Sequence, residues 1–102
     1  MSYRIRRVDD NQKEIVAVFR RLGASVAITS ELGRGFPDLI VGYDNQNVLV
    51  EVKDGSKVPS QQKLTSLEQK FFDEWKGKIV IIRSGIEAVH LMLDLGWNET
   101  CL

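Results

Sequence analysis

Cysteine, histidine and proline are scarce in this sequence. Its 102 residues contain one cysteine, one histidine and two prolines. A single cysteine, Cys101, excludes an intramolecular disulfide and a zinc site built from several cysteines. We therefore expect a chain that folds without such cross-links, in a reducing compartment.

Long apolar runs are also missing. No stretch approaches the roughly 20 apolar residues of a membrane span. Arg4, Arg6 and Arg7 near the N-terminus are not followed by the apolar segment of a signal peptide. With 43% hydrophobic and 27% charged residues, the composition is that of one globular domain over residues 1–102, with no membrane partner.

Net charge is absent as well, because 14 basic residues balance 14 acidic ones. A neutral chain is not one that coats nucleic acid by bulk electrostatics. The charges are unevenly placed, however, with six basic and three acidic side chains in residues 1–21. That end either faces phosphate or is an ordinary solvated surface, and the sequence leaves both interpretations open.

Hydrophobic periodicity predicts an α/β fold with the order α-β-β-β-α-β-α. Asp9 or Asp10 can cap a first helix that runs to about Leu22, where Gly23 ends it. Capping-box patterns beginning at Thr65 and Ser84 open the later helices. Strands are expected at residues 25–29, 39–41, 48–52 and 78–83, the last of them buried. A tight polar turn is expected at residues 43–47 and a polar loop at residues 53–63. The result is a mixed sheet with helices on its faces.

Chemistry is concentrated in Asp38, Glu51 and Lys53. Side chains alternate along a strand, so Glu51 and Lys53 point to the same face. Asp38 begins the strand that forms a hairpin with theirs, which brings its carboxylate near Glu51. Two converging carboxylates suit Mg²⁺, which polarises a phosphate and lowers the pKa of a bound water. Lys53 then serves either to stabilise the added charge or as a general base.

Less specific interpretations exist for each of these residues. Asp38 alone fits a turn aspartate after a proline, and Glu51 with Lys53 fits a solvated, cross-paired strand face. The combination, in a strand flanked by valines, favours the catalytic interpretation.

These residues resemble a known superfamily. Pro37-Asp38 followed by Glu51-Val52-Lys53, on a helix-then-three-strands frame, is similar to the PD-(D/E)xK nucleases, which include restriction endonucleases and Holliday junction resolvases. More narrowly, the chain resembles the virus-type replication-repair nuclease (VRR-NUC) domain over roughly residues 14–89. The segments that carry this narrower resemblance are residues 35–39, residues 50–53, and a stretch that runs from residues 63–65 through Gln69 to residues 75–77.

The resemblance implies a restriction-endonuclease-like fold and a set of roles. Asp38 and Glu51 would be ligands of Mg²⁺ or Mn²⁺, with Glu14 of the first helix as a further metal ligand and Lys53 as the catalytic lysine. A glutamine after the Glu-x-Lys strand would complete the catalytic group; Gln69 is the preferred match, and Gln61, Gln62 and Glu68 remain alternatives. The candidate DNA contacts are Arg34, Gly35, Lys57 and Lys63.

The expected function is a structure-selective DNA endonuclease that cuts four-way junctions as a homodimer in the cytoplasm of a bacterial or phage-infected cell. It would need no small-molecule cofactor beyond the metal. A partner surface is expected on the last helix. Its apolar residues, which include Ile86, Val89 and Leu93, lie nearly all round the helix, and such a helix must be buried on more than one side. The alternatives are a sequence-specific or flap endonuclease, and a DNA-binding module that has lost catalysis.

Overall fold

The computed structural model describes residues 11–101, which form a mixed α/β fold with one four-stranded sheet. The coarse α/β class predicted from the sequence is confirmed. Strands follow the order β1-β2-β3-β4. Strand β2 is antiparallel to both β1 and β3, and β4 is parallel to β3. The elements are α1 (Gln12–Arg21), β1 (Ser25–Ile28), the 3₁₀ turn η1 (Ser30–Leu32), β2 (Leu39–Tyr43), β3 (Gln46–Val52), α2 (Pro59–Gln62), α3 (Ser66–Glu74), β4 (Ile79–Ile82), α4 (Gly85–Asp94) and η2 (Glu99–Cys101).

The hairpin of β2 and β3 is tighter than the sequence predicts. A turn was expected across residues 43–47, but Tyr43 already pairs with Gln46. Asp44 and Asn45 form the connection, with φ angles of 50° and 61°. Two successive positive φ angles are typical of the two-residue turns whose twist matches that of paired strands. The hairpin register is therefore fixed at its closed end.

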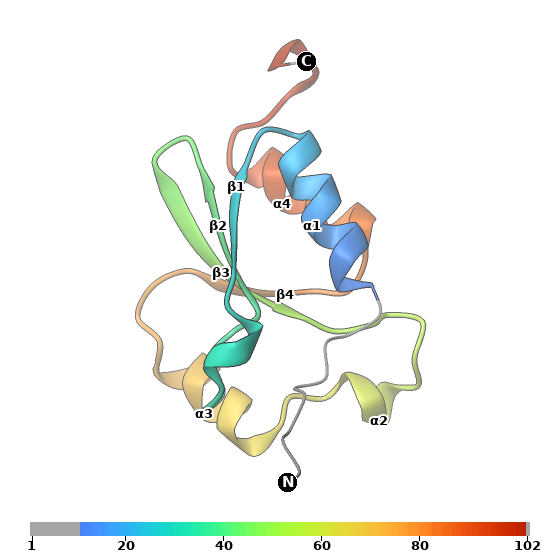
Figure 1. Ribbon diagram of the computed structural model, residues 1–102, viewed down its shortest axis with the longest axis vertical. Coiled ribbons are helices and arrows are strands. Elements are labelled where there is room, and N and C mark those ends of the chain that lie inside the picture. The colour runs from blue at the N-terminus through green and yellow to red at the C-terminus, as the bar shows by residue number, and fades with distance from the viewer. Residues whose placement is uncertain (1–10, 102) are drawn as a thin grey trace, which may run out of the picture.

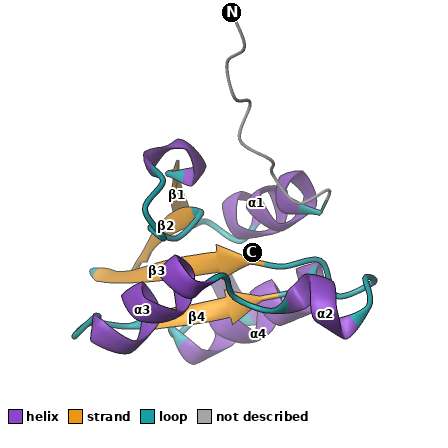
Figure 2. Ribbon diagram, turned by 90° about the horizontal axis from the view of Figure 1, so that it is seen from below, coloured by secondary structure: helices purple, strands orange, loops and turns teal. Residues whose placement is uncertain are grey.

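The two faces of the sheet are covered by different helices. Helices α1 and α4 lie beside each other on one face, and α3 lies on the other (Figures 1 and 2). The core is on the α1 and α4 face, where Phe19, Val50 and Met92 are fully buried. Alternation along β3 then directs Glu51 and Lys53 toward α3.

Two expectations about the second half of the chain need correction. The segment before Thr65 was expected to be a loop, but Pro59–Gln62 forms the short helix α2. Strand β4 was expected to be buried, yet only Ile82 is buried and its other residues are half-buried. The physical reason is its place at the sheet edge, where it pairs with β3 alone.

Helix starts agree only in part with the capping expectations. The capping box of α3 forms as predicted between Thr65 and Glu68. In α4, Ser84 accepts from the Glu87 N–H, but the Glu87 carboxylate accepts from the Arg83 N–H, so the box is not reciprocal. Helix α1 begins after Asn11; Asp9 and Asp10, the expected caps, lie outside the described residues.

Among residues 11–101, no helix has the length and apolar character needed to cross a membrane.

Candidate active site

Asp38 and Glu51 lie next to each other on one face of the sheet. Leu39 pairs with Val50 across β2 and β3, so the next step of the same register places Asp38 opposite Glu51. Directly opposed residues point to the same face. Asp38 Oδ2 also accepts a 2.8 Å hydrogen bond from the Val52 backbone N–H. Because both carboxyl groups are buried, the hairpin holds two acids together where little water reaches them.

The proton affinity of Glu51 reflects this crowding. Burial is the largest cause that raises the pKa of Glu51 from its ordinary value of 4.5 to about 9, and the carboxylates of Asp38 and Glu68 add to it. The ammonium of Lys53 lowers the pKa, but by less. Without a bound cation, Glu51 therefore keeps its proton at neutral pH. A cation placed between the two acids would favour the ionised form of Glu51 and so oppose this shift.

Lys53 follows directly after β3, and its amino group lies among carboxylates. Its Nζ lies 3.6 Å from Glu51 Oε2 and 2.9 Å from Glu68 Oε1. The Lys53 side chain is 11% exposed. Its backbone is fixed as well, because Lys53 N donates to the Ile82 carbonyl and Asn11 donates to the Lys53 carbonyl. The lysine is thus held at both its main chain and its charged end.

Glu68 is the residue of α3 that joins this group. Its Oε1 accepts from Lys53 Nζ and from the Thr65 backbone N–H, each at 2.9 Å. Burial acts to raise the pKa of Glu68, but the hydrogen bond from Thr65 and the interactions with Lys53 outweigh it and hold that pKa below its ordinary value. Glu68 is therefore ionised at neutral pH. The capping box was visible in the sequence, yet nothing in that pattern indicated that the same carboxylate reaches Lys53.

None of the three glutamine candidates joins the group formed by Asp38, Glu51, Lys53 and Glu68. Gln69, the preferred match, donates from Nε2 to Asp73 at 2.8 Å on the exposed side of α3. It does not join the group because it is one residue, about 100° around the helix, from Glu68. Gln62 bonds the Lys57 carbonyl and Arg83 Nε, and Gln61 is exposed.

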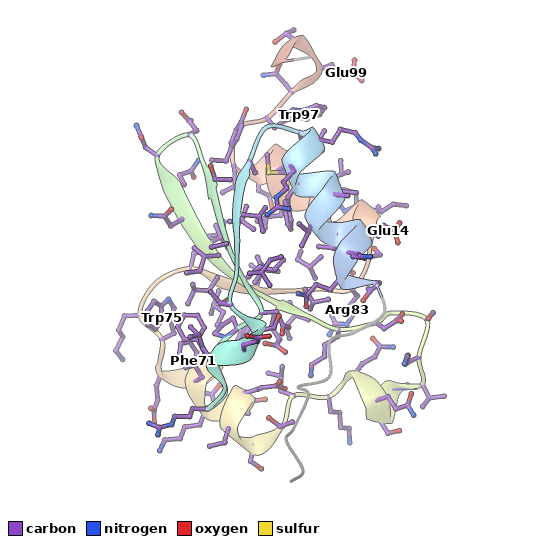
Figure 3. The ribbon with its side chains drawn as sticks, in the orientation of Figure 1. Glu14, Phe71, Trp75, Arg83, Trp97 and Glu99 are labelled. Carbon is purple, nitrogen blue, oxygen red and sulfur yellow. The ribbon has the colours of Figure 1, made fainter. Side chains whose placement is uncertain are left out.

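Glu14, the residue of α1 that was expected at the metal site, points away from it. Glu14 is exposed and lies beside Gly85, where an added Cβ would be 3.3 Å from Glu14 Oε1. Figure 3 places it on the outer side of α1, well apart from Phe71 on α3. The structure therefore does not bring Glu14 to Asp38 and Glu51. Two residues along a helix differ by about 200°, and the inward position belongs to Gln12.

Gln12 supports the backbone under Asp38. Its Nε2 donates to Ser30 Oγ at 3.0 Å, and Ser30 Oγ contacts the Asp38 carbonyl at 3.5 Å. Gln12 is 5% exposed, and its Oε1 has no hydrogen-bond partner. Helical spacing could have found this residue, since Gln12, Ile15 and Phe19 share one face.

The candidate DNA contacts divide into two kinds. Arg34 and Lys63 are exposed and Lys57 is half-exposed, so their charges are accessible to a phosphate. Gly35 is buried instead. A Cβ there would lie 2.3 Å from the Leu67 carbonyl oxygen, and its φ of +82° is one that side chains disfavour. Gly35 therefore serves the close packing of its loop on α3 rather than an open DNA contact.

The acids suit a hard cation with incomplete protein coordination. Within residues 11–101, no group of three or more His, Cys, Asp or Glu side chains is arranged to hold a metal ion. Mg²⁺ commonly takes only one or two carboxylates and completes its octahedron with water and phosphate oxygens. Asp38 and Glu51 fit that requirement, because both are oxygen donors and their crowding favours a cation between them.

Comparisons with known proteins add no relative. No family model, no curated protein and no solved structure matches this chain.

Proposed function

We propose that this chain is a metal-dependent DNA endonuclease of the PD-(D/E)xK type with a VRR-NUC-like domain. The observation that carries the proposal is the opposition of Asp38 and Glu51 on one sheet face, with Lys53 Nζ 3.6 Å from Glu51. The order of helices and strands, with Asp38 just before the second strand and Glu51 and Lys53 at the end of the third and just after it, is consistent with a restriction-endonuclease-like frame.

The chemistry assigns a separate task to each residue. Asp38 and Glu51 would hold Mg²⁺ or Mn²⁺. The bound metal would polarise the scissile phosphate and lower the pKa of a bound water. Lys53 presents a cation beside them, where it would stabilise the charge added to the phosphate in the transition state. We assign it that role rather than general base, because the Glu68 carboxylate 2.9 Å away favours its charged form.

A four-way DNA junction cut by a homodimer is the proposed substrate and assembly. One such site cuts one strand, so resolving a junction needs two sites in fixed relation, which a two-fold axis supplies. Helix α4 offers the surface: its Ala88, Leu91 and Met92 are buried in the core, while Ile86 and Leu93 are 69% and 48% exposed.

Replacing either acid tests the assignment. We expect Asp38→Asn and Glu51→Gln each to lower the single-turnover rate on a four-way junction in Mg²⁺ by more than about 100-fold, because each removes a metal ligand. Circular dichroism and thermal melting should show that both variants still fold, since each replaces a buried acid by a neutral amide of nearly the same shape.

The control variant is Glu74→Gln, which removes an exposed carboxylate at the end of α3. It should cut at the wild-type rate. Linear, flapped and four-way DNA are compared with each variant, and paired symmetric nicks on the junction are the expected product. Wild-type rates in the Asp38 and Glu51 variants would refute the metal site, whereas indiscriminate cutting of linear duplex would refute the junction preference alone.

A further inference from the structure

We infer that Glu68 is a positioning residue that holds the Lys53 ammonium against the metal-binding face, and that it acts on cleavage chiefly through Lys53. This inference deepens the proposed function and depends on it for its catalytic part. It assigns to α3 a role in the active site, although none of the expected metal ligands lies on that helix.

The geometry restricts what Glu68 can do. Its Oε1 accepts two hydrogen bonds of 2.9 Å, one from Lys53 Nζ and one from the Thr65 N–H. The Thr65 bond belongs to the capping box, which fixes the first turn of α3. The same oxygen atom thus joins the start of a helix to the end of strand β3. Hydrogen bonds between charged groups are about twice as strong as neutral ones.

Burial makes this bond consequential. The side chains of Lys53 and Glu68 are 11% and 12% exposed. A lysine has four rotatable bonds and loses much conformational freedom when it is held in one place. A fixed carboxylate partner orders the lysine side chain before substrate binds, so its conformational entropy is not lost during the reaction. A charge that is already in place stabilises a transition state most effectively.

The position of α3 is itself set by close packing. The loop residue Gly35 lies against the Leu67 carbonyl, immediately before Glu68. Phe36 packs edge-on against Phe71, one turn further along the helix, with ring centroids 5.2 Å apart. The loop that delivers Asp38 therefore also locates the helix that delivers Glu68, so the metal ligand and the lysine partner are placed together.

The first test needs neither DNA nor metal. Labelling of lysines by an amine-reactive acetylating reagent is followed residue by residue with mass spectrometry. Lys53 should be labelled several-fold faster in Glu68→Ala than in the wild-type chain, because the carboxylate no longer holds the ammonium. Thr65→Ala is the matched control: it removes the side-chain cap of the same helix but leaves the carboxylate, and Lys53 labelling should stay at the wild-type rate.

The second test measures cleavage in a double-mutant cycle. Glu68→Ala should lower the single-turnover rate by about 10–100-fold at saturating junction DNA, as loss of a supporting residue commonly does. Glu68→Gln, whose amide oxygen can still accept from Lys53, should recover part of that loss. In a Lys53→Ala background, Glu68→Ala should change the rate by less than about twofold, because the interaction it removes is already gone.

Each outcome decides one claim. If Thr65→Ala reproduces the effects of Glu68→Ala on labelling and rate, Glu68 acts merely as a helix cap and the inference is overturned. Additive losses in the Lys53→Ala background overturn it as well, because Glu68 would then act independently of Lys53. A wild-type chain that cuts no DNA refutes the proposed function, while the labelling result still decides whether Glu68 holds the lysine.

Discussion

Glu51 makes the stability of this protein depend on pH in an unusual direction for an acid. Its pKa is raised from 4.5 to about 9 in the folded chain, chiefly by burial. Between these values the folded state binds a proton that the unfolded state has released. The free energy of unfolding should therefore fall as pH rises from about 4.5 to about 9 in metal-free solution.

The measurement is urea unfolding in EDTA at several pH values, with Glu51→Gln beside the wild type. At pH 8 the glutamine variant should be more stable by about 1–3 kcal/mol, because it is neutral without having to bind a proton. Its stability should vary less across this range than that of the wild type. Parallel pH profiles for the two chains would contradict the raised pKa.

At the residue level, spacing in the sequence predicts which side chains share a face only where they come from the same hairpin or helix. Asp38, Glu51 and Lys53 come from one hairpin, so strand alternation and register determine which face they share. Gln12 could be found from its helical spacing with Ile15 and Phe19. The contact of Glu68 with Lys53 depends on how α3 docks on the sheet, which spacing along the chain does not specify. The sequence therefore favours Glu14 and Gln69, each one or two residues from the side chain that faces the group.

At the scale of elements, the contact between the Asp38 loop and α3 is the one most sensitive to a single methyl group. Gly35→Ala should lower the free energy of unfolding by about 3 kcal/mol or more, because its Cβ would overlap the Leu67 carbonyl. Denaturant unfolding measures this change. Displacement of α3 should also weaken the hold of Glu68 on Lys53 and slow cleavage.

Gly23→Ala provides the comparison for that variant. Gly23 also has a positive φ, of 96°, but the nearest atom to an added Cβ is 3.9 Å away. Its expected loss is therefore only about 1 kcal/mol, from backbone conformation alone. Equal losses in the two variants would show that the packing of the loop on α3 contributes little.

The elements themselves were predictable to different degrees. The strands of the hairpin and the capping box of α3 have strong local signals. The capping box forms as predicted, and β2 and β3 lie where predicted but each extends two residues further toward the turn. Helix α2 has four residues, too few for apolar periodicity to reveal it. The half-burial of β4 follows from its place at the sheet edge, and an apolar sequence such as Ile79–Ile82 does not specify that place.

At the scale of the whole molecule, the outer side of α4 makes a specific prediction about assembly. Leu93→Lys should shift the proposed dimer toward monomer, weakening self-association at least tenfold or so, because it places a charge in an apolar contact. Sedimentation equilibrium at micromolar concentration measures the shift. Met92 is unsuitable for this purpose, since it is fully buried in the core and its replacement would test folding.

Leu67→Lys is the matched control for assembly. Leu67 is also exposed, at 58%, but it lies on α3, on the other face of the sheet. It should leave self-association unchanged. A wild-type chain that sediments as a monomer would contradict the proposed dimer and leave the single-site chemistry intact.

The two-residue turn between β2 and β3 has a consequence for the order in which the molecule forms. Hairpins close in about 1–10 μs, whereas contacts across longer loops form later. We therefore expect Asp38 and Glu51 to meet early, before the chain has returned through α3 to β4 and before Glu68 can reach Lys53. Without the surrounding helices neither acid is buried, so both are ionised at neutral pH. We expect their repulsion to oppose this step, so that the carboxyl pair helps to determine how fast this chain folds.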